Sequence, residues 1–205
     1  MTKIIQDLQE ARILLNEDPV KTEGGLSSGN AGESSNFLCY RALRLNYYAV
    51  TGLLARVCLY AGQRENAFNY STEVIKASNN GIFPFVDRSL VNGTAQDPDR
   101  IFSPEVLFAL SDSQRGELFE EYFDPSLAPN MVFRMETDLL EQTIYGGTGT
   151  GGNLDDYRCR SNWISSGSAR YFYKYSDMTE SGRIENTMIP LLRLGEMYLI
   201  AAESQ

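Results

Sequence analysis

The sequence has 205 residues, of which 42% are hydrophobic and 22% charged, a composition typical of a globular protein with one substantial core. With 18 Lys and Arg against 27 Asp and Glu, the net charge is −9, and such a surface repels nucleic acid and anionic lipid headgroups. The chain has no histidine, which excludes Ser-His-Asp and Cys-His catalytic pairs and imidazole metal sites, so we expect no metal and no cofactor.

The N-terminal segment predicts an amphipathic helix over residues 3–15, because its apolar residues recur at spacings of three and four. It lacks the continuous apolar core and the cleavage site of a signal peptide. No run of about 18 apolar residues, the length that spans a membrane, occurs anywhere in the sequence. Two alternatives follow: a cytoplasmic protein, or a chain that begins downstream of its targeting segment.

Two consecutive helices are predicted over residues 37–60 and 64–78, with a polar loop over residues 23–35 before them. The turn Ala61-Gly62-Gln63 separates the helices, and its glycine is a typical C-cap. Small residues at Ala55 and Ala67 flank Gly62 at the spacings of a tetratricopeptide unit, in which short side chains let paired helices approach closely. The sequence therefore predicts a tetratricopeptide-like helical hairpin.

Helical periodicity fades between residues 81 and 187, where prolines and glycines alternate with aromatic residues. Short strands are predicted over residues 106–110 and 168–175, and a short helix over residues 135–145. A strongly apolar helix is predicted over residues 190–202, with Pro190 in its first turn. The predicted fold is a single, mainly α domain: residues 1–80 and 188–205 form the helical scaffold, and residues 81–187 form a loop-rich insertion with a few short strands.

Three segments together resemble the SusD/RagB family. Its core helical hairpin is similar to residues 45–77, LNYYAVTGLLARVCLYAGQRENAFNYSTEVIKA. Its I-P-x-x-R-x-x-E-x-x-L-x-x-A-E helix is similar to residues 189–203, IPLLRLGEMYLIAAE. Its D-x-R segment resembles Asp156-Tyr157-Arg158, which Trp163 follows.

The resemblance implies a surface-exposed lipoprotein of the outer membrane of Bacteroidota. Such a protein sits on a SusC-like, TonB-dependent transporter, captures glycans for import, and has four tetratricopeptide-like units around an irregular ligand-binding region. The signal peptide, the lipidated cysteine and the later helices of the family are absent from this sequence. We therefore expect a truncated member, incomplete at both ends, whose only attachment to the membrane is a lipid anchor absent from this chain.

Glycan capture requires aromatic rings on which the apolar faces of sugars stack, with polar side chains nearby to bond the hydroxyl groups. The loop-rich region offers both kinds of residue, and the candidate ligand-binding residues are Trp163, Tyr157, Tyr145, Tyr171, Asn162 and Arg160. These candidates rest on side-chain chemistry alone, because binding positions vary within the family. The alternative for each is a place in the protein core.

Two further pairs are predicted to be structural. Arg193 and Glu196 lie three residues apart, a spacing at which an ion pair forms within one helix. Asp156 and Arg158 alternate along a segment predicted to be extended, which puts both on one side, where they tie loops to the scaffold.

The loop YGGTGTGGN at residues 145–153 contains the pattern G-x-G-x-x-G of dinucleotide-binding proteins. A dinucleotide loop follows a hydrophobic strand and opens a helix, and here neither flank fits. We interpret the glycines as a flexible connection between the acidic segment and the D-x-R segment, with two alternatives: a rim of the ligand site or a disordered loop.

The leading hypothesis is a glycan-binding protein of an uptake system, and the alternative is a tetratricopeptide-like scaffold for protein–protein interaction. We expect no catalytic activity. The adjacent carboxylates at Glu120-Glu121 and Asp155-Asp156 give no sign of the two facing carboxyl groups of a glycosidase.

Overall fold

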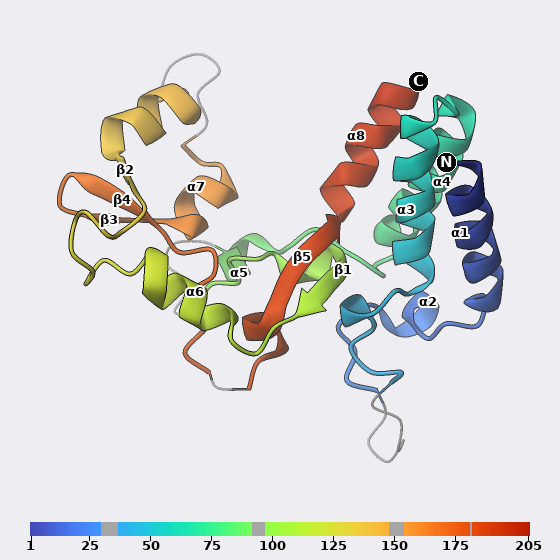
Figure 1. Cartoon of the computed structure of the whole chain (residues 1–205), viewed down its shortest axis with the longest axis horizontal. Helices are drawn as coiled ribbons and strands as arrows, with labels where there is room; N and C mark the ends of the chain where they lie inside the picture. The colour runs from blue at the N-terminus through green and yellow to red at the C-terminus, as the bar shows by residue number, and fades with distance from the viewer. Residues whose placement is uncertain (30–36, 92–96, 148–153, 181) are drawn as a thin grey trace. The chain divides into compact units, whose positions relative to one another are not determined.

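The structure, a computed structural model, describes residues 1–29, 37–91, 97–147, 154–180 and 182–205 (Figure 1). The chain divides into two compact units. The first contains Met1–Phe85, Pro104–Ser111 and Ile189–Gln205, and the second contains Val86–Ser103 and Asp112–Met188. The mainly α fold with a few short strands is confirmed. None of the helices in the described ranges is long and apolar enough to cross a membrane.

The first unit is built on helices. They are α1 (Thr2–Leu14), α2 (Val20–Glu23), the 3₁₀ turn η1 (Arg41–Leu43), α3 (Tyr47–Tyr60), α4 (Arg64–Asn79) and α8 (Leu194–Ser204). Helix α3 packs against α1 and α4, and α8 packs against α4 and α3 (Figure 1). Strands β1 (Val106–Ser111) and β5 (Met188–Arg193) pair in a two-stranded sheet.

Helices α3 and α4 form the predicted hairpin. Gly62 adopts a φ of 73°, the left-handed conformation that ends a helix and favours glycine. Ala55 and Ala67 are completely buried within the main core of this unit. The tetratricopeptide-like spacing therefore identifies two small residues that both helices bury in one core.

The helix predicted over residues 37–60 begins instead at Tyr47, because Asn46 caps it. The Asn46 side chain accepts a hydrogen bond from the backbone N–H of Ala49, and its amide group donates to the carbonyl oxygen of Leu107 at 2.8 Å. Just upstream, Tyr40 has a φ of 47°, which no α-helix contains. The residues predicted to cap this helix, 34–36, lie outside the described ranges.

A buried carboxylate fixes the start of two helices in this unit. Asp18 accepts hydrogen bonds from the backbone N–H groups of Val20 at 3.0 Å and Tyr47 at 3.2 Å, at the beginnings of α2 and α3. Both of its oxygens also bind the guanidinium of Arg41, at 3.0 and 2.7 Å, and both side chains are buried.

The helix predicted over residues 190–202 is a strand followed by a helix. Residues Met188–Arg193 form β5, and α8 begins only at Leu194. A residue before a proline avoids the helical conformation, and a proline is tolerated in an edge strand, so Pro190 suits β5 better than a helix. Gly52 of α3 leaves space beside Leu192 and Met197, because a Cβ atom there would lie 2.9 Å from Leu192 Cδ2 and 3.2 Å from Met197 Sδ.

The second unit contains short helices and a three-stranded sheet. Its helices are α5 (Arg88–Val91), α6 (Arg115–Tyr122), the π-helix η3 (Leu139–Ile144), α7 (Tyr157–Asn162) and the 3₁₀ turn η4 (Ile184–Thr187), and the 3₁₀ turn η2 (Ser103–Glu105) begins at its border. The antiparallel sheet has the order β2-β4-β3, with β2 at Arg134–Glu136, β3 at Trp163–Ser166 and β4 at Ala169–Phe172.

The predicted strand over residues 168–175 is confirmed. The predicted helix over residues 135–145 is wrong at its start, because residues 135 and 136 pair with β4.

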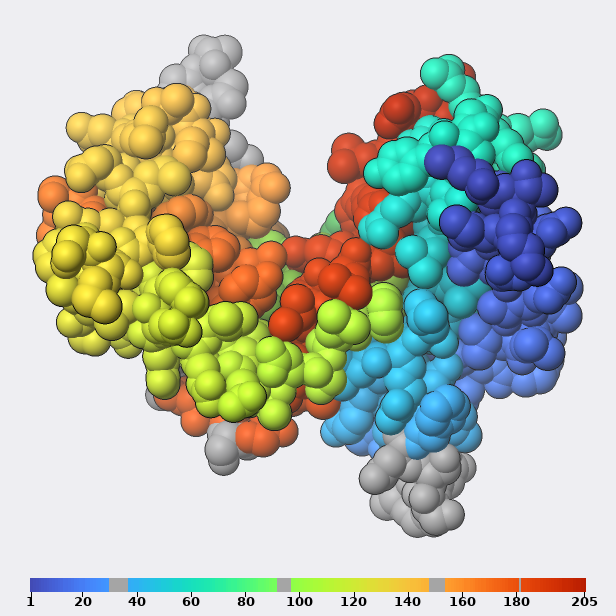
Figure 2. Space-filling model, in the orientation of Figure 1, coloured from blue at the N-terminus to red at the C-terminus, as the bar shows by residue number. Residues whose placement is uncertain are grey.

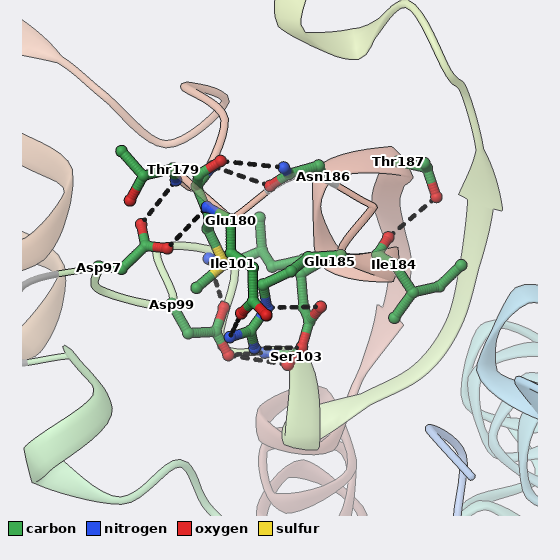
Figure 3. Close-up of polar contacts among 12 residues, drawn as sticks. Asp97, Asp99, Ile101, Ser103, Thr179, Glu180, Ile184, Glu185, Asn186 and Thr187 are labelled. Atoms are coloured by element: carbon green, nitrogen blue, oxygen red, sulfur yellow. Dashed lines mark hydrogen bonds and ion pairs between the residues drawn. The ribbon is translucent and has the colours of Figure 1, made fainter. Parts of the chain in front are cut away.

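Polar contacts join three separate segments of this unit (Figure 3). Asp97 accepts from the backbone N–H of Thr179 at 3.1 Å, and buried Asp99 accepts from the N–H and the hydroxyl of Ser103. Arg115, only 2% exposed, donates to the carbonyl oxygen of Glu185 at 2.7 Å and binds the Asp177 carboxylate at 3.2 Å. Burial raises the pKa of Asp99, although the Ser103 donors act in the opposite direction. These bonds hold chain segments that contain little regular structure.

Candidate functional site

The second unit carries a groove of about 370 Å³ whose walls are mostly aromatic. Its lining residues are Phe123, Phe133, Arg134, Met135, Trp163 and Phe172. The volume lies within the range of about 300–1,000 Å³ that is usual for sites of small ligands. A groove with aromatic, mostly apolar walls suits a ligand that has apolar faces.

The register of the sheet places three of these side chains on one face. Trp163 of β3 stands directly opposite Phe172 of β4, and their rings lie 5.0 Å apart. Met135 of β2 stands opposite Arg170, which shares a face with Phe172 because alternate residues of a strand point the same way. In Figure 2 the yellow segment around β2 packs directly against the orange segment of β3 and β4.

The remaining rings come from the end of α6 and from the segment before β2. Phe123 follows the last residue of α6, and its ring lies 5.6 Å from Phe172 and 5.8 Å from Phe133. The backbone N–H of Phe133 donates to the carbonyl oxygen of Tyr122 at 2.7 Å, which ties the two segments together. Phe133 is 64% exposed, so its ring is available to a ligand.

Tyr145 supports the tryptophan of the groove. The Trp163 side chain donates a hydrogen bond to the Tyr145 hydroxyl. Burial raises the pKa of the Tyr145 hydroxyl. Of the predicted ligand-binding residues, the structure thus brings Trp163 and Tyr145 together, with Trp163 in the groove wall and Tyr145 beside it.

The other four predicted residues lie elsewhere. Tyr171 is buried with Val132 and Ala169 on the opposite face of the sheet, and buried Asn162 ends α7. Tyr157 and Arg160 are exposed on α7, where Arg160 pairs with Asp155, and they do not line the groove.

Sequence reasoning missed the phenylalanines at 123, 133 and 172 and the residues Arg134 and Met135. Their positions follow from strand pairing between residues 134–136 and 169–171, which no local pattern reveals. The available signal was the density of aromatic residues on both sides of the predicted strand at 168–175.

The two predicted structural pairs differ from expectation. Arg193 is the extended residue before α8, with φ −130° and ψ 153°, so it does not share a helical face with Glu196. Glu196 instead binds Arg56 of α3 at 2.6 Å, and Arg193 lies 3.8 Å from Glu105. Asp156 and Arg158 do pair, at 2.6 Å, but Asp156 is the N-cap of α7, so the pair is local and the segment is not extended.

Only residues 145–147 of the glycine-rich loop are described; residues 148–153 lie outside the described ranges, and the interpretation of this loop stays a prediction.

In the described parts of the chain, no group of three or more His, Cys, Asp or Glu side chains has the arrangement of a metal site. Cys58 and Cys159 are buried thiols that form no disulfide.

Comparison with solved structures identifies the fold. A putative sugar-binding protein from Bacteroides vulgatus superposes with a TM-score of 0.56 at 23% identity, over 99% of this chain and 40% of its own. A SusD superfamily protein from the same organism superposes with a TM-score of 0.54 at 20% identity, over 98% of this chain and 40% of its own. No family model and no curated protein sequence matches the chain. The chain therefore has a SusD-like fold, as the sequence resemblance implied, and spans about 40% of the length of these solved chains.

Proposed function

We propose that this chain is a member of the SusD/RagB family and that it binds oligosaccharides in the aromatic groove. The observation that carries this proposal is the set of four rings, Phe123, Phe133, Trp163 and Phe172, around one groove in a chain with a SusD-like fold. A solved protein with the same fold is described as a putative sugar-binding protein.

The chemistry of the groove suits sugars. The C–H faces of a pyranose are apolar and pack against aromatic rings, whose burial is a large favourable contribution to binding. Trp163 and exposed Phe133 supply two such surfaces. The side chains that line the groove within the described residues include no carboxylate, which favours binding without hydrolysis.

The cellular role follows from the family resemblance. We place the protein at the surface of the outer membrane, held by a lipid anchor, where it delivers oligosaccharides to a SusC-like, TonB-dependent transporter. Chemical crosslinking in outer membranes, followed by identification of the crosslinked partner, tests this assignment. A transporter of that class is the expected partner.

The binding proposal is tested by calorimetry against a panel of oligosaccharides selected on a glycan array. We expect Trp163→Ala and Phe133→Ala each to weaken binding by about tenfold, since each removes one stacking surface. Tyr157→Ala is the matched control, because Tyr157 is a partly exposed aromatic residue of the same unit that does not line the groove. Circular dichroism establishes that each variant is folded. The proposal is overturned if no oligosaccharide binds, or if both groove variants bind as tightly as the wild type.

A further inference from the structure

The walls of the groove offer a ligand almost no hydrogen-bonding group. In the described part of the chain, five uncharged side chains line it: Phe123, Phe133, Met135, Trp163 and Phe172. The sixth lining residue, Arg134, stands opposite Tyr171 in the sheet, so its side chain lies on the other face, where Tyr171 is buried. The guanidinium is therefore turned away from the groove.

Polar groups beside the rings already have partners within the protein. The indole N–H of Trp163 donates to the Tyr145 hydroxyl. The backbone N–H of Phe133 donates to the carbonyl oxygen of Tyr122 at 2.7 Å, and Trp163 pairs with Phe172 across β3 and β4. A ligand hydroxyl group turned into this groove thus loses its hydrogen bonds to water and gains none from the side chains that the structure describes there.

The walls form one continuous apolar surface. The ring of Phe172 lies 5.0 Å from that of Trp163 and 5.6 Å from that of Phe123. Met135 adds a thioether side chain, which is flexible enough to adjust to the shape of a ligand. Burying a hydroxyl group without a hydrogen bond is unfavourable, whereas burying a methyl group against such walls is favourable. The groove therefore discriminates between these two substituents.

We propose that the groove selects neutral sugar rings that carry a methyl group where the parent sugar has a free hydroxyl group. The methyl group is that of a 6-deoxy ring or of an acetyl ester. This inference rests on the proposed function and adds the chemical class of the ligand. The methyl group packs on the aromatic wall, while the other hydroxyl groups of the ring face the solvent that reaches exposed Phe133. The net charge of −9 favours neutral rings over anionic ones.

The test compares oligosaccharides of the same length and linkage that differ at one ring. The parent ligand has all its hydroxyl groups free, the second ligand has a 6-deoxy ring, and the third carries one acetyl ester. Calorimetry on the whole chain is expected to give about five- to tenfold tighter binding for the two methyl-bearing ligands. Their heat-capacity change of binding is expected to be more negative than that of the parent, because more apolar surface is buried. The two arms identify which methyl group the site prefers.

Three variants assign the preference to the groove wall. Met135→Gln keeps the length of the side chain but offers a donor and an acceptor to a ligand hydroxyl group, so the preference is expected to fall to about twofold or less. Met135→Leu keeps the wall apolar and is expected to retain the preference. Met131→Gln is the matched control: it makes the same change at a methionine of the same unit that is 63% exposed and does not line the groove, and the preference is expected to remain. Circular dichroism establishes that each variant is folded.

The outcomes separate this inference from the proposed function. Equal binding of the parent and the methyl-bearing ligands, or tighter binding of the parent, overturns the inference while Trp163→Ala still tests glycan binding itself. A preference that is unchanged in Met135→Gln, or that is lost equally in Met131→Gln, also overturns it, since the effect would then arise outside the groove. If no oligosaccharide of any kind binds, the proposed function fails first.

Discussion

Tyr47 lies at the centre of a charged network in the first unit. Its hydroxyl donates to Glu73 at 2.7 Å, and the same carboxylate is bound by Arg12 at 2.7 and 2.8 Å. Burial, and then the hydrogen bond to Glu73, raises the pKa of Tyr47 to about 12. The phenol is therefore kept protonated in the folded state over a pH range in which an exposed tyrosine ionises.

This shift predicts a specific dependence of stability on pH. An unfolded tyrosine loses its proton near pH 10, whereas the folded one keeps it to about pH 12, so the stabilisation is complete below pH 10 and is lost between pH 10 and 12. We expect the free energy of unfolding of the wild type to exceed that of Tyr47→Phe at pH 8, and the difference to shrink as the pH approaches 12. Urea unfolding at a series of pH values measures it.

The control for the loss of one phenol is Tyr60→Phe, at a side chain that is 72% exposed. A constant difference between the wild type and Tyr47→Phe across this pH range would contradict the prediction.

At the scale of elements, Asp18 decides where α2 and α3 begin. A single carboxylate serves the backbone N–H groups of Val20 and Tyr47 and the guanidinium of Arg41. Replacing this carboxylate with the neutral amide of asparagine would keep the size of the side chain but would leave the Arg41 charge buried without its counter-charge. Removing one partner of a buried ion pair typically destabilises a protein by about 3–5 kcal/mol.

We therefore predict that Asp18→Asn lowers the free energy of unfolding by about 3–5 kcal/mol. Asp7→Asn is the matched control, because Asp7 pairs with Lys3 on the surface of α1, where both side chains are more than half exposed. A pair of that kind contributes less than about 0.5 kcal/mol. Urea titration of both variants measures the difference; equal stability of the two would show that the buried pair does not hold these helix starts.

Most elements of the helical unit are predictable from sequence because their signals are local. Glycine at position 62 and the flanking alanines locate the hairpin, and the periodicity of residues 3–15 locates α1 within one residue. The predictions are wrong where contact with a residue far along the chain overrides the local preference for helix. Asn46 bonds the carbonyl oxygen of Leu107, and Pro190 lies in a strand because β1 runs beside it.

The residues of the candidate site also divide into those that local sequence signals identify and those that depend on a distant partner. Trp163 is identifiable from sequence, as the only tryptophan in a polar setting. The groove beside it is not identifiable, because Phe133 and Met135 reach it only through the pairing of β2 with β4. Tyr171 is an aromatic candidate like Trp163, but it faces the other side of the sheet. Neighbouring residues of a strand point to opposite faces, so a shift of one position along the strand decides whether a ring reaches the groove.

At the scale of the whole molecule, the net charge of −9 acts against ligands that carry negative charge. The carboxylates of the surface repel every negative charge on the ligand. Added salt screens this repulsion, because the screening length falls from about 30 Å at 0.01 M to about 8 Å at 0.15 M.

We therefore predict that the binding affinity depends on how many acidic groups the ligand carries. At about 0.01 M salt, an oligosaccharide with one acidic ring among neutral rings is expected to bind more tightly than one of the same length with an acid on every ring. The difference is expected to narrow at about 0.15 M salt, because repulsion between the extra charges and the acidic protein is then screened. Calorimetry of both ligands at the two salt concentrations measures this difference. Tighter binding of the fully charged ligand at low salt would contradict the prediction and would mean that the surface around the groove is locally positive.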